Sequence, residues 1–199
     1  VTGVQTCALP ICSVVYENSI DEKLLQLGAF RKGKYSEEYI RGVYHNNVNQ
    51  IIQLVPKLVE NNIKSFRISS SLFPLYEFNH ELIWNDLVLK QKLRKLGTLF
   101  KDANIRVTTH PGQFCIINSD SEHVIKNSIA ELEYHAWIFD QMGFDLTTHY
   151  AINIHGGKRG NSEKLIRTIL SLPDNVKNRL TLENDERCFS VSQQIGRAH

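Results

Sequence analysis

Four short apolar runs in this chain each end in a cluster of polar residues, and a helical pattern follows the first three clusters. The runs cover residues 66–68, 105–107, 151–154 and 180–182, and the clusters cover 69–71, 110–113, 155–157 and 183–185. A strand, a polar residue at its carboxyl end and then a helix form the repeating unit of a (β/α) barrel, whose active site lies at that end of the strands. The spacing therefore predicts parallel strands joined by right-handed helical crossovers.

Helical patterns fill the spaces between the runs. Apolar residues between positions 40 and 59 form a helical stripe, with Ser36 placed to cap the helix and Pro56 expected to kink or split it. The other expected helices cover residues 86–101, a stretch from the capping-box pattern at 119–122 up to Gly143, and 162–172.

The length of the chain limits how much of a barrel it can form. The chain has 199 residues, of which 42% are hydrophobic and 22% are charged, which suits one globular domain with a core. A complete eight-fold barrel typically needs about 250 residues. We therefore predict an α/β fold, the amino-terminal half of a TIM (β/α)8 barrel with about four βα units.

The two ends of the chain do not share the patterns of the rest. Residues 1–13 and 195–199 have no clear period and resemble translated sequencing-adapter read-through, so the expected domain covers residues 14–194. Cys7, Cys12 and His199 would then carry no structural or chemical meaning.

The net charge and the cysteine content exclude few classes of function. The formal net charge is +2, which neither requires nor rules out a nucleic-acid partner, because a basic groove can be balanced by acidic residues elsewhere. The four cysteines form no zinc-type C-x-x-C pair and are expected to be free thiols in a reducing cytoplasm. No apolar run approaches the roughly 18 residues of a membrane span, and we recognise no signal peptide. We therefore expect a cytoplasmic protein without a membrane partner.

Three residues are candidates for a metal site. His110, His155 and Glu183 each follow an apolar run, and successive parallel strands would bring them to the same edge of the sheet. Two imidazoles and a carboxylate are common ligands of divalent metal ions. A buried histidine that is satisfied by the backbone is the alternative for each histidine alone, but independent burial would not place all three residues at strand ends.

Two further loops could bind nucleic acid. Gly156, Gly157 and Gly160 surround Lys158 and Arg159, and such a flexible basic loop can approach a phosphate, although most loops of this composition are ordinary turns. Gln113 and Phe114 follow His110, and an aromatic ring beside an amide could stack on and probe a nucleobase. The alternative is that Phe114 packs inward. We expect His45, His123 and His135, within helical patterns, to be surface or packing residues.

With these motifs the chain resembles the UV damage endonucleases of the endonuclease IV-like barrel superfamily. The matching stretches are 66–74, 109–114, 153–157 and 180–185, with smaller matches at residues 134–135 and 142–143, and the resemblance covers roughly residues 20–194. It implies a metal-dependent enzyme that nicks double-stranded DNA immediately 5′ of a UV photoproduct, leaving a 3′-hydroxyl and a 5′-phosphate. It also implies up to three divalent ions, commonly manganese, with magnesium or zinc as alternatives, and a monomer when full length.

The resemblance also implies roles for individual residues. His110 and His155 correspond to ligands of one ion, Glu183 to the carboxylate that bridges it to the next, and all three to catalytic residues. Gln113 and Phe114 correspond to the lesion-probing pair, and Lys158 and Arg159 are expected to contact the DNA. The family usually has a histidine shortly after the Pro74 turn; an ungapped match places Phe78 there, and a two-residue insertion brings in His80 as a further metal ligand.

Parts of the family pattern are missing from this chain. The family's first strand is absent or overwritten, and its later strands, with further metal ligands, would lie beyond residue 199. We therefore expect the chain to be inactive by itself. Two other functions stay open: a metal-dependent sugar isomerase or epimerase on a related barrel, and an inactive DNA-binding remnant. The loop after His110 discriminates the endonuclease from the sugar enzyme, since exposed base-probing side chains favour DNA and a closed polar pocket favours a sugar. Metal content and nicking assays would separate the endonuclease from the remnant.

Overall fold

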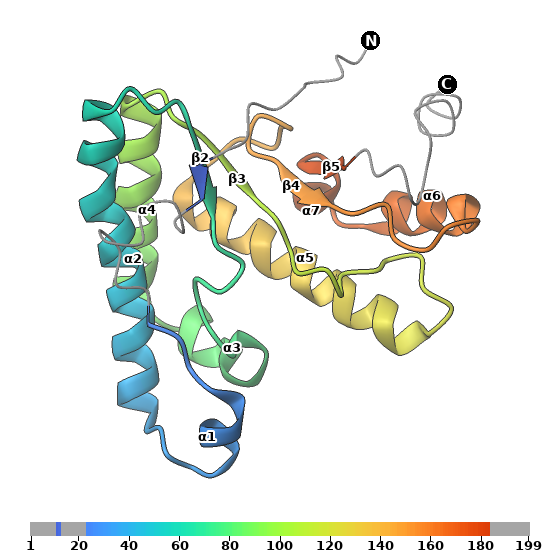
Figure 1. Cartoon of the computed structure of the whole chain (residues 1–199), viewed down its shortest axis with the longest axis horizontal. Helices are drawn as coiled ribbons and strands as arrows, with labels where there is room; N and C mark the ends of the chain where they lie inside the picture. Colours follow the sequence, from blue (N-terminus) through green and yellow to red (C-terminus); the bar gives the residue numbers. More distant parts are fainter. Residues whose placement is uncertain (1–10, 13–22, 184–199) are drawn as a thin grey trace. The chain divides into compact units, whose positions relative to one another are not determined.

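The computed structural model describes residues 11–12 and 23–183 (Figure 1). Cys7, Asn184, Asp185, Cys188 and His199 lie outside the described residues. The chain divides into two compact units, residues 1–108 and 109–199, and the boundary falls inside strand β3 (Arg106–Thr109).

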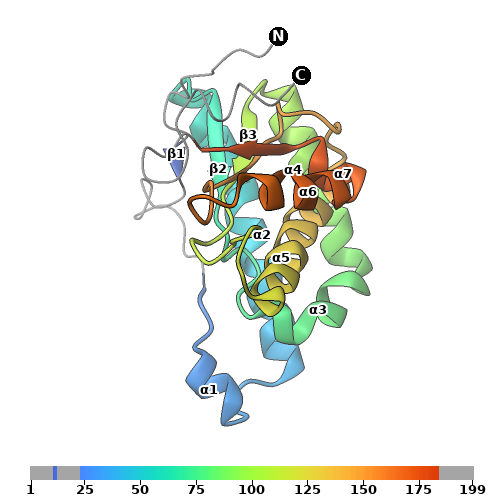
Figure 2. The ribbon, with the colours of Figure 1, turned by 90° about the vertical axis from the view of Figure 1, so that its right-hand side faces the viewer.

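In its described residues, the first unit combines parallel strands with four helices. Strand β1 (Ile11–Cys12) pairs in parallel with β2 (Ser65–Ile68), and the backbone N–H of Arg106 donates to the carbonyl of Lys64 at 2.9 Å. The strand β1 lies inside the segment interpreted as read-through, and the bounds of that segment stay a prediction. The helices are α1 (Leu27–Arg31), α2 (Glu37–Glu60), α3 (Tyr76–Trp84) and α4 (Leu87–Asp102), of which α2 and α4 lie side by side in both views (Figures 1 and 2).

Helix α2 follows the expected stripe with two differences. Ser36 caps it as predicted, since its hydroxyl accepts the N–H of Tyr39 at 3.1 Å. The helix continues unbroken through Pro56, so the expected split is wrong. Burial of Val55 and Leu58 on either side of Pro56 opposes the roughly 3 kcal/mol that proline costs inside a helix. The stripe ends earlier than predicted, because Val59 is half-exposed.

The second unit contains three parallel strands in chain order. Thr109 of β3 pairs with Ile152 of β4 (Ile152–Ile154), and β4 pairs with β5 (Leu180–Leu182) over its whole length. The helices are α5 (Glu122–Met142), α6 (Ser162–Ser171) and α7 (Asp174–Lys177). All four expected strands are therefore present, in βα repeats as predicted.

Helix α5 begins later than the capping-box pattern suggests. Its N-cap is Ser121 rather than Ser119, and the hydroxyl of Ser119 instead accepts the N–H of Ser121 in a local turn. The helix ends at Gly143 as predicted, in the left-handed conformation (φ +71°) that glycine adopts without strain.

A buried arginine anchors the last strand. Arg179, directly before β5, is fully buried, and its guanidinium donates to the carboxylate of Asp140 and to the carbonyl of Phe144, both at 2.6 Å. Further bonds reach the carbonyls of Ala136 and Asp145 at 3.2 Å. These contacts fix the start of β5 to the carboxyl end of α5, and the sequence analysis assigned no role to this residue.

Among the described residues, no helix is both long enough and apolar enough to cross a lipid bilayer.

Candidate metal centre

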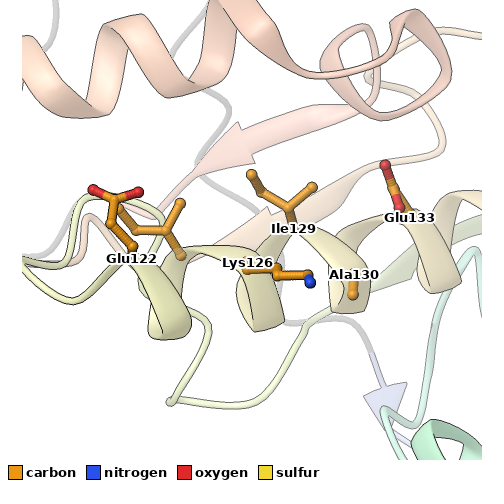
Figure 3. A pocket seen from close by; sticks show the side chains of 6 residues that line it. Glu122, Lys126, Ile129, Ala130 and Glu133 are labelled. Carbon is orange, nitrogen blue, oxygen red and sulfur yellow. The ribbon is translucent and has the colours of Figure 1, made fainter.

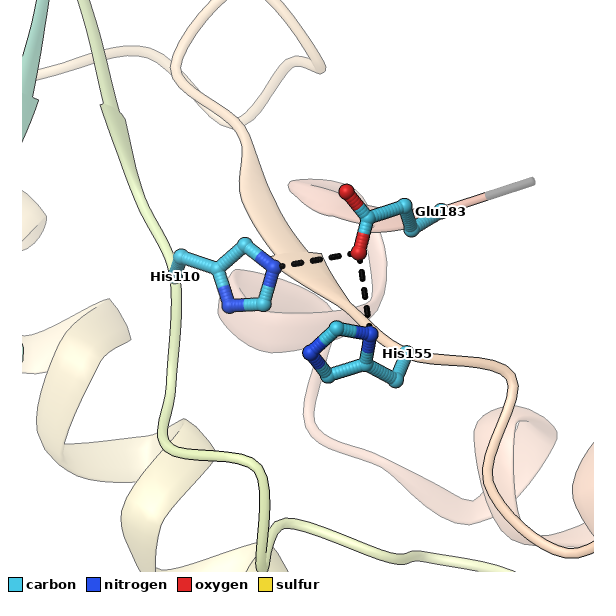
Figure 4. Close-up of side chains that lie close together, drawn as sticks. All are labelled: His110, His155 and Glu183. Carbon is cyan, nitrogen blue, oxygen red and sulfur yellow. Dashed lines mark hydrogen bonds and ion pairs between the residues drawn. The ribbon is translucent and has the colours of Figure 1, made fainter. Parts of the chain in front are cut away.

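The three strand ends of the second unit bring the predicted ligands together. His110 directly follows β3, His155 follows β4 and Glu183 follows β5. Because the three strands are parallel and adjacent, their carboxyl ends lie at the same edge of the sheet. Figure 4 shows both imidazole rings pointing toward the Glu183 carboxylate.

The ligand atoms converge on one point. The Glu183 Oε2 atom lies 2.9 Å from His155 Nδ1 and 3.4 Å from His110 Nε2, and the two ring centroids are 4.8 Å apart. One ligand atom from each residue lies within 4.8 Å of the others. The side chains are 15%, 39% and 46% exposed for His110, His155 and Glu183, so the cluster remains open to solvent on one side. An open site leaves room for water and substrate to bind the same ion.

The hydrogen bond on the far side of His110 supports metal binding. Its Nδ1 lies 2.9 Å from the carbonyl oxygen of Pro111, which can only accept, so Nδ1 carries the proton. In the neutral ring, the Nε2 lone pair then points at the Glu183 carboxylate. Two electron-rich atoms facing each other are stabilised by a cation between them. A second hydrogen bond that fixes the tautomer is typical of metal-binding histidines, and the donor set of two nitrogens and an oxygen fits Mn²⁺ or Zn²⁺.

One face of α5 supports the loop that carries His110. Ser128, Glu131 and His135 are spaced three and four residues apart, so they lie on the same side of the helix. The Ser128 hydroxyl accepts the N–H of Ile116 at 2.8 Å, Glu131 accepts the N–H of Gly112 at 2.7 Å, and His135 Nδ1 lies 2.9 Å from the hydroxyl of Thr109. The backbone on both sides of Gln113 and Phe114 is therefore held, while their side chains remain outside.

His135 is the least accessible of the histidines in helices. It is buried, and its Nε2 has no hydrogen-bond partner among the described residues. Burial, and secondly the nearby His110, lower the pKa of His135 to about 3, so the ring is neutral at ordinary pH. It is a packing residue, as expected, but it also contacts Thr109, the residue directly before His110. His45 contacts Asp86 at 2.9 Å, and His123 is exposed beside Asn127.

The buried His135 predicts a loss of stability in acid. The unfolded chain takes up this proton near the ordinary pKa of 6.5, whereas the folded protein resists it down to about 3. The free energy of unfolding should therefore fall as the pH drops from about 6.5 toward 3, and this contribution is complete above 6.5. Urea unfolding with chelator present, at several pH values, should show a smaller loss for His135→Asn, which can keep the bond to Thr109. If the free energy of unfolding fell equally with pH in the wild-type protein and in His135→Asn, the lowered pKa of His135 would be contradicted.

Gln113 and Phe114 are both exposed, so the alternative that Phe114 packs inward is wrong. Phe114 is 79% exposed, the highest value among the large apolar side chains that the structure describes as exposed. Burial of its neighbour Cys115 anchors the loop, and that burial, with Glu131 nearby, raises the pKa of the Cys115 thiol to about 12. The loop, held by its hydrogen bonds to α5, thus presents an aromatic ring to solvent.

The basic loop after His155 is a structured turn. Gly157 and Gly160 have positive φ angles, and Lys158 forms an ion pair with Asp120. Arg159 is exposed and has no ion-pair partner among the described residues. Of the two cations predicted to contact DNA, Arg159 is therefore the one that remains available.

The structure places His80 in the first unit, whereas His110, His155 and Glu183 belong to the second unit. It is exposed on α3, and its ring centroid lies 4.9 Å from that of Trp84. Phe78, the residue at the ungapped position, is also exposed and lies 5.6 Å from the ring of Phe30. The assignment of His80 as a ligand stays a prediction.

A shallow pocket on α5 does not involve the cluster. Figure 3 shows its lining, which comes from α5 alone: Glu122, Ile125, Lys126, Ile129, Ala130 and Glu133. Apolar side chains between charged ones, without converging polar groups, do not suggest a catalytic site.

Comparison with known proteins places the chain in one family. The family profile described as "UV-endonuclease UvdE" matches residues 11–196. The chain belongs to the UvdE family. It is 39% identical to the UV DNA damage endonuclease of Nostoc sp. over 158 residues, which cover 79% of this chain and 49% of that protein. It is 32% identical to the UV DNA damage endonuclease of Clostridium perfringens over 189 residues, covering 92% of this chain and 44% of that protein.

A solved structure extends the likeness to the fold. The crystal structure of SacUVDE matches with a TM-score of 0.76 and 32% identity, covering 86% of this chain and 58% of that one. The chain therefore spans about half the length of its UvdE relatives, and the predicted half-barrel is confirmed. The cluster and the exposed loop both lie within the range that the family profile matches.

Proposed function

We propose that the protein carrying this chain is a metal-dependent endonuclease that nicks double-stranded DNA immediately 5′ of UV photoproducts. The observation that carries the proposal is the convergence of His110, His155 and Glu183 at three adjacent strand ends. Membership of the UvdE family supports DNA repair as the role. We further propose a full-length monomer that acts in the cytoplasm.

The cluster has the groups that phosphodiester hydrolysis requires. His110 Nε2, His155 Nδ1 and Glu183 Oε2 would hold a divalent ion, which we propose is manganese, with magnesium or zinc as alternatives. Such an ion polarises a phosphoryl oxygen and lowers the pKa of a bound water. Among the described residues, Glu183 makes both of its contacts through Oε2. Its other oxygen is left for a second ion, as the proposed bridging role requires.

The exposed loop supports DNA rather than a small polyol as substrate. Phe114, with Gln113 beside it, can stack on a base that has left the helix, and a photoproduct is easier to extrude because it is already poorly stacked. Arg159 offers a cation for a backbone phosphate. A sugar isomerase would instead need a closed polar pocket around its substrate.

The decisive experiment is a nicking assay on the reading frame extended to the length of its relatives. The substrate is a duplex with one defined thymine dimer, with Mn²⁺ or with chelator, and a dimer-free duplex is the control. We expect a manganese-dependent nick directly 5′ of the dimer and no nick by the 199-residue chain alone. A folded, metal-loaded extended protein that leaves the dimer duplex intact would refute the proposal.

Metal-binding, sugar-turnover and DNA-binding measurements on the same extended protein separate the two other functions. Metal binding without nicking, together with turnover of sugar substrates, would favour the isomerase. DNA binding without metal would favour the inactive remnant.

A further inference from the structure

Two loops of the second unit meet around one buried amide. The β3–α5 loop (residues 110–121) carries His110, and the β4–α6 loop (residues 155–161) carries His155. Asn118, in the first loop, is 0% exposed although its side chain is polar. A buried amide is costly unless its donors and acceptor are all satisfied, so its partners show what it holds in place.

Every polar atom of the Asn118 side chain is directed at the β4–α6 loop. Its Oδ1 accepts the backbone N–H of Lys158 at 2.7 Å. Its Nδ2 donates to the carbonyl of Lys158 at 2.9 Å and, at 3.5 Å each, to the carbonyls of Gly156 and Asn161. One side chain therefore takes the place of backbone pairing for the segment directly after His155.

Gly157 allows the β4–α6 loop to approach the Asn118 side chain closely. Its φ of +72° is a conformation that other residues adopt only with strain, and a Cβ at this position would collide with Asn118 Oδ1. The close approach of the loop to Asn118 thus depends on glycine at position 157, and the loop closes around the amide rather than around an outside ligand. The N–H of Lys158, which a phosphate would need, is already used.

Asn161 and Asp120 add a second connection. Asn161 is the N-cap of α6, yet its side chain does not cap the helix. Its Nδ2 instead donates to the carbonyl of Asn118 and to Asp120 Oδ1, both at 3.1 Å, and Asp120 also pairs with Lys158. An asparagine at an N-cap position usually bonds its own helix, whereas the Asn161 side chain bonds the other loop. This indicates that the contact between the two loops has its own structural role.

We propose that Asn118 is a positioning residue of the metal centre, which holds the His155 loop against the His110 loop and so sets the separation of the two imidazoles. The contacts from α5 hold the His110 loop in place, and the Asn118 side chain holds the residues after His155 against that loop. The same bonds hold the backbone of Lys158, next to the exposed Arg159. The inference rests on the proposed metal-dependent function.

The test uses the extended protein with the substitution Asn118→Asp. The shape and the acceptor for the Lys158 N–H remain, but an oxygen replaces the Nδ2 donor opposite three carbonyl groups. We expect Mn²⁺ affinity, measured by electron paramagnetic resonance well below the melting temperature, to fall about 10–100-fold, the range for partners that orient metal ligands. Backbone hydrogen exchange in residues 156–161 should accelerate in parallel. Asn127→Asp, the same change at an exposed position of α5, is the control and should bind as wild type.

Asn161→Ala is the second variant, in case Asn118→Asp does not fold. It removes the bonds from the Asn161 side chain to the Asn118 carbonyl and to Asp120 but leaves the Asn118 side chain in place. We expect a loss of metal affinity of up to about tenfold. Wild-type Mn²⁺ affinity in either folded variant would overturn the positioning role of Asn118, even if the melting temperature fell. His110→Ala separates this failure from failure of the proposed function. If the wild-type protein binds no Mn²⁺, or if its Mn²⁺ binding survives His110→Ala, the proposed metal centre itself is wrong.

Discussion

Replacing Glu183 with glutamine is expected to remove metal binding at the strand-end cluster while the fold stays intact. Glutamine keeps the shape of the side chain but loses the negative charge that faces both imidazoles, at 2.9 and 3.4 Å. Loss of a partner that only orients a ligand costs 10–100-fold in affinity, so loss of a direct anionic ligand should weaken Mn²⁺ binding by more than about 100-fold.

The effect on DNA cleavage should be larger still. Glu183 is proposed to hold one ion and to bridge to the next, so its loss affects both the activated water and the neutralised phosphate. Removing a single electrostatic stabiliser from an active site costs 10²–10³ in rate, and we expect nicking of the dimer duplex to fall by about a thousandfold or more.

Isothermal titration with Mn²⁺ and the nicking assay test this prediction together. Glu133→Gln, the same substitution on the exposed face of α5, is the matched control and should behave as wild type. The side chain of Glu183 is 46% exposed, so its replacement should leave the thermal unfolding curve nearly unchanged. Wild-type affinity in the Glu183→Gln protein would show that the cluster is not the metal site.

The largest effect on stability is expected from Arg179→Met. The guanidinium is fully buried and donates to Asp140 and to several backbone carbonyls of the second unit. Methionine fills part of the volume but donates nothing, so the carboxylate and the carbonyls lose their partner. The Asp140 carboxylate is 35% exposed, so water can replace its partner, but the buried carbonyls of Ala136 and Phe144 lose their donor. A buried polar group left without a partner costs about 1–3 kcal/mol, so we expect a loss of about 2–5 kcal/mol.

Urea unfolding of the extended protein measures this loss. Arg167→Met, at an exposed position of α6, is the matched control and should change the free energy of unfolding by less than about 0.5 kcal/mol. Since Arg179 directly precedes β5, Arg179→Met should also weaken Mn²⁺ binding through a displaced Glu183. A variant as stable as wild type would mean that the buried arginine contributes no net stability.

Short-range patterns account for much of what could be predicted. Ser36 and Gly143 bound their helices as expected, because a cap depends on a few neighbouring residues. The grouping of His110, His155 and Glu183 also followed from the sequence. Adjacent parallel strands deliver their last residues to one edge, so the strand pattern alone predicts which side chains meet.

The sequence by itself thus determined the βα repeat and the grouping of His110, His155 and Glu183, since both depend on periodicity and strand direction. Only the tertiary structure decided how the cluster is supported. Asn118 lies 40 residues from Lys158 and Arg179 lies 39 residues from Asp140, and no local pattern marks either pair. Likewise, the exposure of Phe114 depends on contacts between its loop and α5. Burial and polar pairing are properties of side chains that meet through packing, and a single sequence does not record which distant residues those are.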